Sequence, residues 1–258
     1  MTRKHHLAIT LAALLLSQIT GLAQARKNIT VSPSDNVITH VADGGQWSTS
    51  ITLVNLSNFT ASFTLHFYGD DGSPLALPFV GGSGFPTSTL SGTLPVNGSR
   101  TFQTTGAPGP TVQGWAQLDS NEDVGGFAVF KSHLAGQKDS EAVVPIGSRF
   151  DARSVLVFDN TNGYVIGVAL VNPSTFDIAT VILTFRDENG NQFDQDSFLM
   201  DPLTHDAFSL AQAYPLTIGR KGTVEISTTS ATFSALGLRF SPAGPFTSFH
   251  TLSAAAWR

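Results

Sequence analysis

An internal repeat of about a hundred residues constrains the fold of this chain more than any other feature. Residues 53–57 (LVNLS) recur as residues 170–174 (LVNPS), and the segments that follow match in order and spacing. The other matched pairs are 63–68 with 181–186, 70–72 with 187–190, 114–118 with 222–226, and 127–130 with 236–239. A repeat this long that occurs twice indicates a duplicated domain, because solenoids repeat shorter units many times.

Within each copy, apolar and polar residues alternate as they do in strands with one buried face. Phe63, Leu65 and Phe67 share one face, while His66 and Tyr68 lie on the other, which we expect to be exposed. Strand-like segments are separated by Gly, Asn, Asp and Pro, and tight turns are predicted at 71–72 (DG) and 189–190 (NG). Each copy therefore predicts seven or eight strands in an immunoglobulin-like β-sandwich.

We divide the chain into three parts. Residues 1–25 are expected to be a signal peptide, residues 26–148 a first sandwich domain, and residues 149–258 a second one. The repeat cores are 37–146 and 153–257, and a short polar join lies at 147–152. Each copy carries its own alternating strands, so each is expected to fold by itself.

The beginning of the chain has the layout of a secretory signal. Arg3 and Lys4 precede an apolar stretch at 7–16, and the triplet 23–25 (AQA) fits a cleavage site after Ala25. The apolar stretch is shorter than the roughly 20 residues that cross a bilayer, and no later stretch is long and apolar enough. These features predict a secreted or periplasmic protein with no transmembrane segment in its mature chain.

Composition limits the partners and the covalent chemistry. Removing the signal leaves 12 Lys and Arg against 19 Asp and Glu, a formal charge of −7. Nucleic acids and anionic lipids are bound through clustered Lys and Arg, so neither is an expected partner. The chain contains no cysteine, which excludes disulfide bonds and an acylated-cysteine anchor.

Three segments carry a family resemblance. Residues 42–55 (ADGGQWSTSITLVN), 72–75 (GSPL) and 125–130 (GGFAVF) resemble a repeat found in uncharacterised secreted proteins of soil bacteria. The resemblance covers the first copy well. The second copy has 159–164 (DNTNGY) in place of Asp-Gly-Gly-x-Trp, so it resembles a diverged member. The resemblance implies export and a tandem sandwich fold, and it implies no activity.

The sequence contains no recognisable catalytic, cofactor or metal motif. The five histidines of the predicted mature chain do not have zinc-ligand spacing; they are His40, His66, His133, His205 and His250. Asp187–Asp196 is the best calcium candidate, but its glycine and acidic residues depart from the known calcium loop, which favours a hairpin turn. We therefore expect no enzyme activity and no cofactor, and leave calcium binding by this loop undecided.

Aromatic residues offer the one candidate binding site. Trp47, Trp115 and Tyr68 could form a platform on which sugar rings stack, although core packing is favoured for both tryptophans and exposure for Tyr68. The preferred hypothesis is a non-catalytic extracellular module for adhesion, matrix or surface scaffolding, with a polysaccharide or a protein as partner. A carbohydrate-binding module is the first alternative. A hydrolase whose carboxylates meet only in the fold is the second.

Overall fold

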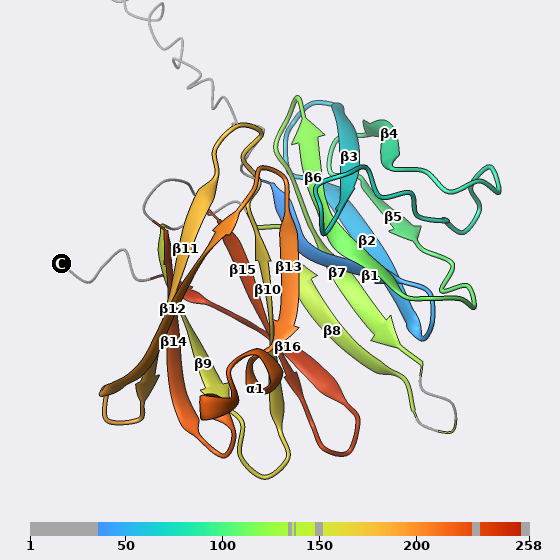
Figure 1. Cartoon of the computed structure of the whole chain (residues 1–258). Helices are drawn as coiled ribbons and strands as arrows, with labels where there is room; N and C mark the ends of the chain where they lie inside the picture. The colour runs from blue at the N-terminus through green and yellow to red at the C-terminus, as the bar shows by residue number, and fades with distance from the viewer. Residues whose placement is uncertain (1–35, 134–135, 137, 148–151, 229–232, 254–258) are drawn as a thin grey trace, which may run out of the picture. The chain divides into compact units, whose positions relative to one another are not determined.

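The repeat in the sequence reappears as a repeat of strand order (Figure 1). The computed structural model describes residues 36–133, 136, 138–147, 152–228 and 233–253. The strands of the first half are β1 (Val37–Asp43), β2 (Trp47–Asn55), β3 (Ala61–Gly69), β4 (Thr89–Leu94), β5 (Ser99–Gln103), β6 (Val112–Ser120), β7 (Val124–Ser132) and β8 (Ser140–Pro145).

The second half follows the same plan and adds two short helices. Its strands are β9 (Arg153–Asp159), β10 (Val165–Val171), β11 (Ala179–Asp187), β12 (Gln192–Met200), β13 (His205–Ser209), β14 (Lys221–Thr228), β15 (Ser234–Phe240), β16 (Phe246–His250) and β17 (Leu252–Ser253). The α-helix α1 (Leu210–Ala213) and the 3-10 helix η2 (Pro215–Thr217) lie between β13 and β14.

Both halves have the same sheet topology. In the first half the sheets run β1-β6-β3-β4 and β5-β2-β7-β8. In the second they run β9-β14-β11-β12 and β13-β10-β15-β16, with β17 added at the edge of β9. All pairs are antiparallel, as the turn-rich sequence predicts. The expectation of an all-β sandwich fold is confirmed.

The repeat also holds at single positions. Gly114 in β6 and Gly222 in β14 were matched in the sequence, and each faces a carbonyl oxygen of the neighbouring strand. A β-carbon at either position would lie 1.9 Å from that oxygen, which belongs to Tyr68 in one copy and Arg186 in the other. Only glycine allows so close an approach of two backbones, so the same residue is required twice.

Each half has its own apolar core between its two sheets. In the first half the core includes Ile51 and Leu53 of β2 together with Phe67 of β3. In the second it includes Leu170 of β10 and Phe185 of β11. The inward positions are those that the alternation predicted for 63–68 and 181–186.

The predicted boundaries fall mostly outside the described residues. The signal peptide at 1–25 lies outside them, as does the domain boundary between 148 and 149. Both sandwiches belong to one compact unit, Val31–Arg258, so the independent folding of each half stays a prediction. Among the described residues, neither helix has the length and apolar character needed to cross a bilayer.

Candidate site between the two sandwiches

The second sandwich packs an outer sheet face against the first. On β10, Val168 and Leu170 belong to the core of their own sandwich, whereas Ala169 and Val171 belong to clusters shared with the first sandwich. In β2 the position equivalent to Ala169 is Thr52. Its hydroxyl makes a solvent-exposed hydrogen bond with the hydroxyl of Thr101. The contact therefore joins different surfaces of two related units, which is a heterologous arrangement.

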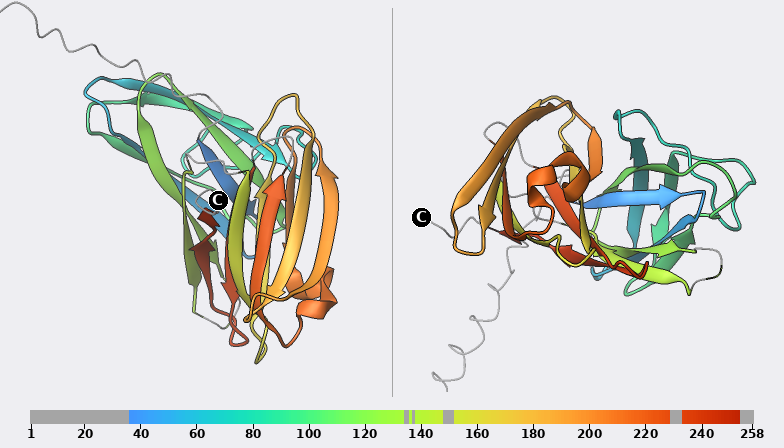
Figure 2. Two further views of the ribbon diagram at one scale, coloured as in Figure 1. Left: turned by 90° about the vertical axis from the view of Figure 1, so that its left-hand side faces the viewer. Right: turned by 60° about the horizontal axis from the view of Figure 1, so that its bottom comes forward.

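Two apolar clusters fill this contact; Figure 2 shows the ribbons of the two halves in two further views. The larger, which we call the aromatic interface cluster, consists of Phe130, Ala142 and Val144 of the first half and Ala169, Leu236 and Phe246 of the second. The smaller, the tryptophan cluster, consists of Val37, Trp115 and Val171, with Tyr68 and Leu203 packed against it. The edges β8 and β16 also meet, where the Ser248 hydroxyl donates to the Val143 carbonyl.

A β-bulge in β1 provides the polar contacts across the interface. Its register against β6 shifts by one residue between Ile38 and Val41, so that Thr39 and His40 lie opposite Trp115 alone. The equivalent pair in the second half, β9 with β14, has continuous register. Bulges redirect side chains and are frequent beside functional sites. This bulge is present in the first half and absent from the second.

Both residues of the bulge reach the second sandwich. The Thr39 hydroxyl lies 2.7 Å from the Ser234 hydroxyl. Nδ1 of His40 lies 3.0 Å from Nε2 of His205, and the two imidazoles stack with centroids 5.1 Å apart. The bulge thus connects β1 to both β13 and β15.

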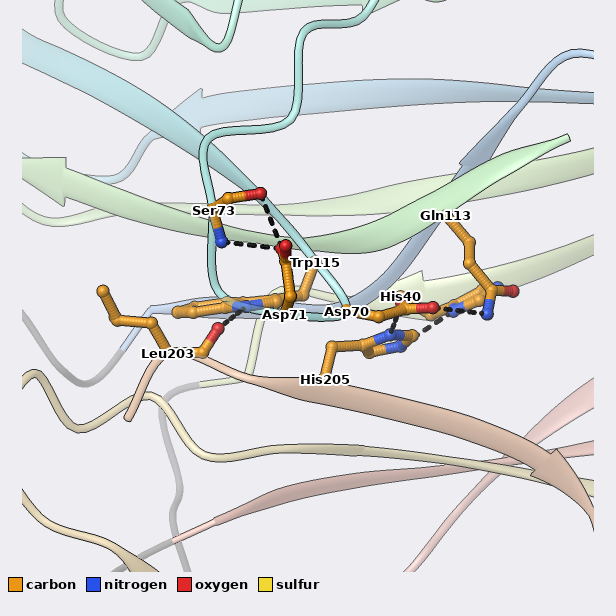
Figure 3. Close-up of polar contacts among 8 residues, drawn as sticks. All are labelled: His40, Asp70, Asp71, Ser73, Gln113, Trp115, Leu203 and His205. Carbon is orange, nitrogen blue, oxygen red and sulfur yellow. Dashed lines mark hydrogen bonds and ion pairs between the residues drawn. The ribbon is translucent and has the colours of Figure 1, made fainter. Parts of the chain in front are cut away.

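A chain of hydrogen bonds continues from His205 back into the first sandwich (Figure 3). Nδ1 of His205 lies 2.7 Å from the carboxylate of Asp70, and Gln113 donates to the other oxygen of that carboxylate at 3.0 Å. A carboxylate only accepts, so Nδ1 of His205 is the donor. When both imidazoles are neutral, Nε2 of His205 accepts from Nδ1 of His40, and Nε2 of His40 carries a free lone pair.

Burial sets the protonation of this chain. Desolvation, reinforced by the neighbouring His205, lowers the pKa of His40 to about 3. Burial alone would raise the pKa of Asp70, but the hydrogen bonds from His205 and Gln113 lower it below its usual range. At neutral pH, His40 is therefore uncharged and donates to His205 through Nδ1, and Asp70 is an anion with two donors.

The structure places Trp115 and Tyr68 together, with Trp115 buried and Tyr68 half-buried. Trp115 is fully buried, and its indole N–H donates to the Leu203 carbonyl at 2.8 Å. Tyr68 stacks on it with ring centroids 4.8 Å apart. Tyr68 does lie on the polar face of β3, as expected, but the second sandwich partly covers that face. Trp115 is therefore not a free stacking surface, and one face of the Tyr68 ring is occupied by Trp115.

Leu203 has an unusual backbone conformation at this contact. Its φ is +63°, a region that L residues other than Asn and Asp seldom adopt. The preceding residue, Pro202, and Leu203 itself lie against Gly72 of the acidic turn of the first half. The turns at 70–72 and 201–204 therefore pack together. This packing holds Leu203 in a conformation that it would not otherwise favour.

In the calcium candidate, the first acidic residue, Asp187, takes part in a hairpin turn. Asp187 accepts backbone hydrogen bonds from Asn189 and Asn191, both at 2.9 Å, and one from the Asn191 side chain at 3.1 Å. These bonds form the hairpin between β11 and β12. Within the described ranges, no group of three or more His, Asp or Glu side chains is placed to hold a metal ion.

Trp47 lines a cavity between the two sandwiches. The cavity has a volume of about 280 Å³. Its lining consists of His40, Ala42, Trp47, Thr111, Gln113 and Phe130 from the first half, and Gly167, Val168, Ala169, Ala207, Phe208, Ser209, Leu238 and Phe240 from the second. Trp47 is half-buried and meets Phe246 edge to face at 5.3 Å. Of the three predicted aromatic residues, Trp47 is the one that faces this space.

Sequence reasoning missed the chain formed by His40, His205 and Asp70. These residues lie far apart in the sequence, so no spacing connects them. One signal for the interface was present: β10 reads VIGVALV, and such a run is typical of a strand buried on both faces. The equivalent strand β2 alternates.

Comparison with known proteins adds no assignment to this site, because no protein-family model matches the chain and no curated protein matches it in sequence.

Proposed function

We propose that this protein is a non-catalytic exported module that serves in adhesion, matrix formation or surface scaffolding, and that its two sandwiches act as one rigid body. The observation that supports the proposal is the interface between the two sandwiches. Two apolar clusters and a chain of hydrogen bonds from His40 to Gln113 connect the halves. An interface of this kind suits a protein that bears load or holds two surfaces at a fixed spacing.

The state of His40 supports a role without catalysis. A general base is most effective when its pKa lies near the working pH, whereas burial lowers the pKa of His40 to about 3. In the described part of the chain, no serine or threonine hydroxyl is hydrogen-bonded to Nε2 of His40. The Asp70–His205–His40 chain therefore resembles a catalytic relay in connectivity but has a weak base at its end.

The carbohydrate-binding alternative has less support. A sugar platform needs accessible rings, and Trp115 is fully buried while Tyr68 stacks on it. Trp47 lines a cavity whose other walls are mostly apolar. Sugars carry many hydroxyl groups that need hydrogen-bond partners when buried, and this lining offers few.

The test is attachment by a strain that lacks the protein. We expect the deletion to lower retention of cells on a surface or in their matrix, and the intact chain to restore it. His40→Gln should restore it as well, because no catalysis is required. Ala169→Asp, which places a charge in the aromatic interface cluster, should fail to restore it. Thr52→Asp, at the equivalent half-buried position outside both interface clusters, is the matched control and should restore it.

Two results would overturn the proposal. One is unchanged attachment in the deletion strain. The other is turnover of a chromogenic glycoside or ester by the purified chain that is lost in His40→Gln, which would make the relay catalytic.

A further inference from the structure

The cavity between the sandwiches has the size of a small-molecule site. Its volume is about 280 Å³. A cavity of about 150 Å³ with an apolar lining is enough for benzene, and sites for drug-sized ligands begin at about 300 Å³. This space therefore fits a molecule of one or two fused rings.

The walls select for an uncharged, flat molecule. Trp47 and Phe130 come from the first half, and Phe208 and Phe240 come from the second. Aromatic rings in this number favour a ligand that is itself a ring, through stacked and edge-to-face contacts. None of the lining residues is Asp, Glu, Lys or Arg, so a charged ligand would lose its hydration without gaining a partner.

The imidazole of His40 presents a free polar atom, Nε2, at the wall. Among the described residues, no fully buried side-chain nitrogen or oxygen lacks a hydrogen-bond partner. Nε2 of His40 has no hydrogen-bond partner among these residues, since this imidazole contacts His205 through Nδ1. Nε2 is therefore accessible, and His40 lines the cavity. The bulge in β1 is what gives His40 this position, and it has no counterpart in β9.

We propose that this cavity binds one uncharged aromatic molecule of one or two fused rings that bears a hydroxyl or N–H group, such as a phenol or an indole, and that this group donates to Nε2 of His40. The rings lie among Trp47, Phe130, Phe208 and Phe240. The site does not depend on the scaffolding role, because the ligand would bind in the cavity between the sandwiches and not on an outer surface.

Calorimetric titration of the purified protein with three probes tests the site. 2-Naphthol has two rings and a hydroxyl donor, 2-methoxynaphthalene has the same rings without the donor, and 2-naphthoate carries a charge. We expect 2-naphthol to bind at least tenfold more tightly than 2-methoxynaphthalene, and 2-naphthoate to show no binding. Equal affinities of 2-naphthol and 2-methoxynaphthalene would overturn the role of His40.

Two variants and one control variant locate the binding. Ala207→Leu fills the cavity from β13 and should weaken 2-naphthol binding at least tenfold. Thr101→Leu, at the equivalent exposed position of β5, is the matched control and should leave it unchanged. His40→Phe keeps a ring but removes the acceptor, so the preference for 2-naphthol over 2-methoxynaphthalene should disappear. If Ala207→Leu, shown by its melting curve to be folded, binds 2-naphthol as the parent does, the cavity is not the site.

Discussion

Asn55 and Asn172 occupy equivalent buried positions in the two sandwiches and make the same hydrogen bonds. Nδ2 of Asn55 lies within 3.1 Å of the carbonyl oxygens of Phe59, Leu94 and Pro95. Nδ2 of Asn172 lies within 3.1 Å of those of Asp177, Met200 and Asp201. Their Oδ1 atoms accept from the backbone N–H of Ser57 and Ser174. The repeated LVN segment thus ends each time in a residue that holds two loops together.

Replacing either asparagine by alanine should destabilise the protein. Asn55→Ala and Asn172→Ala leave buried carbonyl groups without donors, and an unsatisfied buried group costs about 1–3 kcal/mol. We expect each to lower the free energy of unfolding in urea by about that amount. Asn58→Ala changes an exposed asparagine and is the control, with an expected change within about 0.5 kcal/mol. Equal stability of all three variants would contradict the shared role.

Acid should weaken the protein through His40. The pKa of His40 is about 3 in the folded protein, against an ordinary value of 6.5. Between these values the unfolded chain binds a proton that the folded chain does not, so stability is lost as the pH falls through this range. The loss is at most about 1.4 kcal/mol per pH unit from this group.

The variant His40→Gln isolates this effect, because its amide can still donate to His205 and does not titrate. The lowered pKa of Asp70 adds to the loss of stability in acid, whereas burial raises the pKa of Asp206, which acts in the opposite direction. Both carboxylates remain in the variant. Urea unfolding from pH 7 to 4.5 should therefore show a flatter dependence in His40→Gln. Parallel curves would mean that the pKa of His40 is the same in the folded and unfolded states, and would contradict this prediction.

Among the aromatic residues at the interface, Trp115 should be the one whose substitution destabilises the protein most. It is fully buried, so Trp115→Ala is expected to cost about 3–5 kcal/mol. Trp115→Phe keeps a ring but leaves the Leu203 carbonyl without its donor, with an expected cost of about 1–3 kcal/mol. Trp47→Ala should cost less than Trp115→Ala, since Trp47 is half-buried. Urea melts of the three variants rank them, and a larger loss for Trp47→Ala would contradict this assignment.

The first half expressed alone, residues 26–148, is expected to fold and to associate with itself. Its core lies within its own strands, so it should show a cooperative thermal transition. Separation exposes Trp115, Val37 and Phe130, which are buried in the intact protein, and exposed apolar patches promote association.

Sedimentation measures this association. Trp115→Thr, which copies the Thr223 found at the equivalent position of β14, should shift the isolated half toward the monomer. An isolated half that is monomeric without the substitution would mean that the interface surface is not exposed. An isolated half without a cooperative transition would count against independent folding.

The sequence by itself determined the all-β sandwich class, and its internal repeat predicted a duplicated domain. Alternation in 63–68 and 181–186 indicates which face of each strand is buried. The glycines at 114 and 222 stand where the backbones of two neighbouring strands approach closely within one sheet. These are local requirements, so they leave a local pattern that can be recognised twice. The structure confirms the all-β sandwich fold that this pattern predicted.

Only the tertiary structure decided how the two sandwiches meet and what lies between them. His40, Asp70 and His205 come together because a bulge in β1, a turn after β3 and the start of β13 converge across the interface. Their contact depends on the complementary shapes of two folded surfaces, which no spacing along the chain encodes. The apolar run of β10 signalled that its outer face is covered, but its partner surface is formed by strands more than twenty residues away and appears only after both sandwiches have folded.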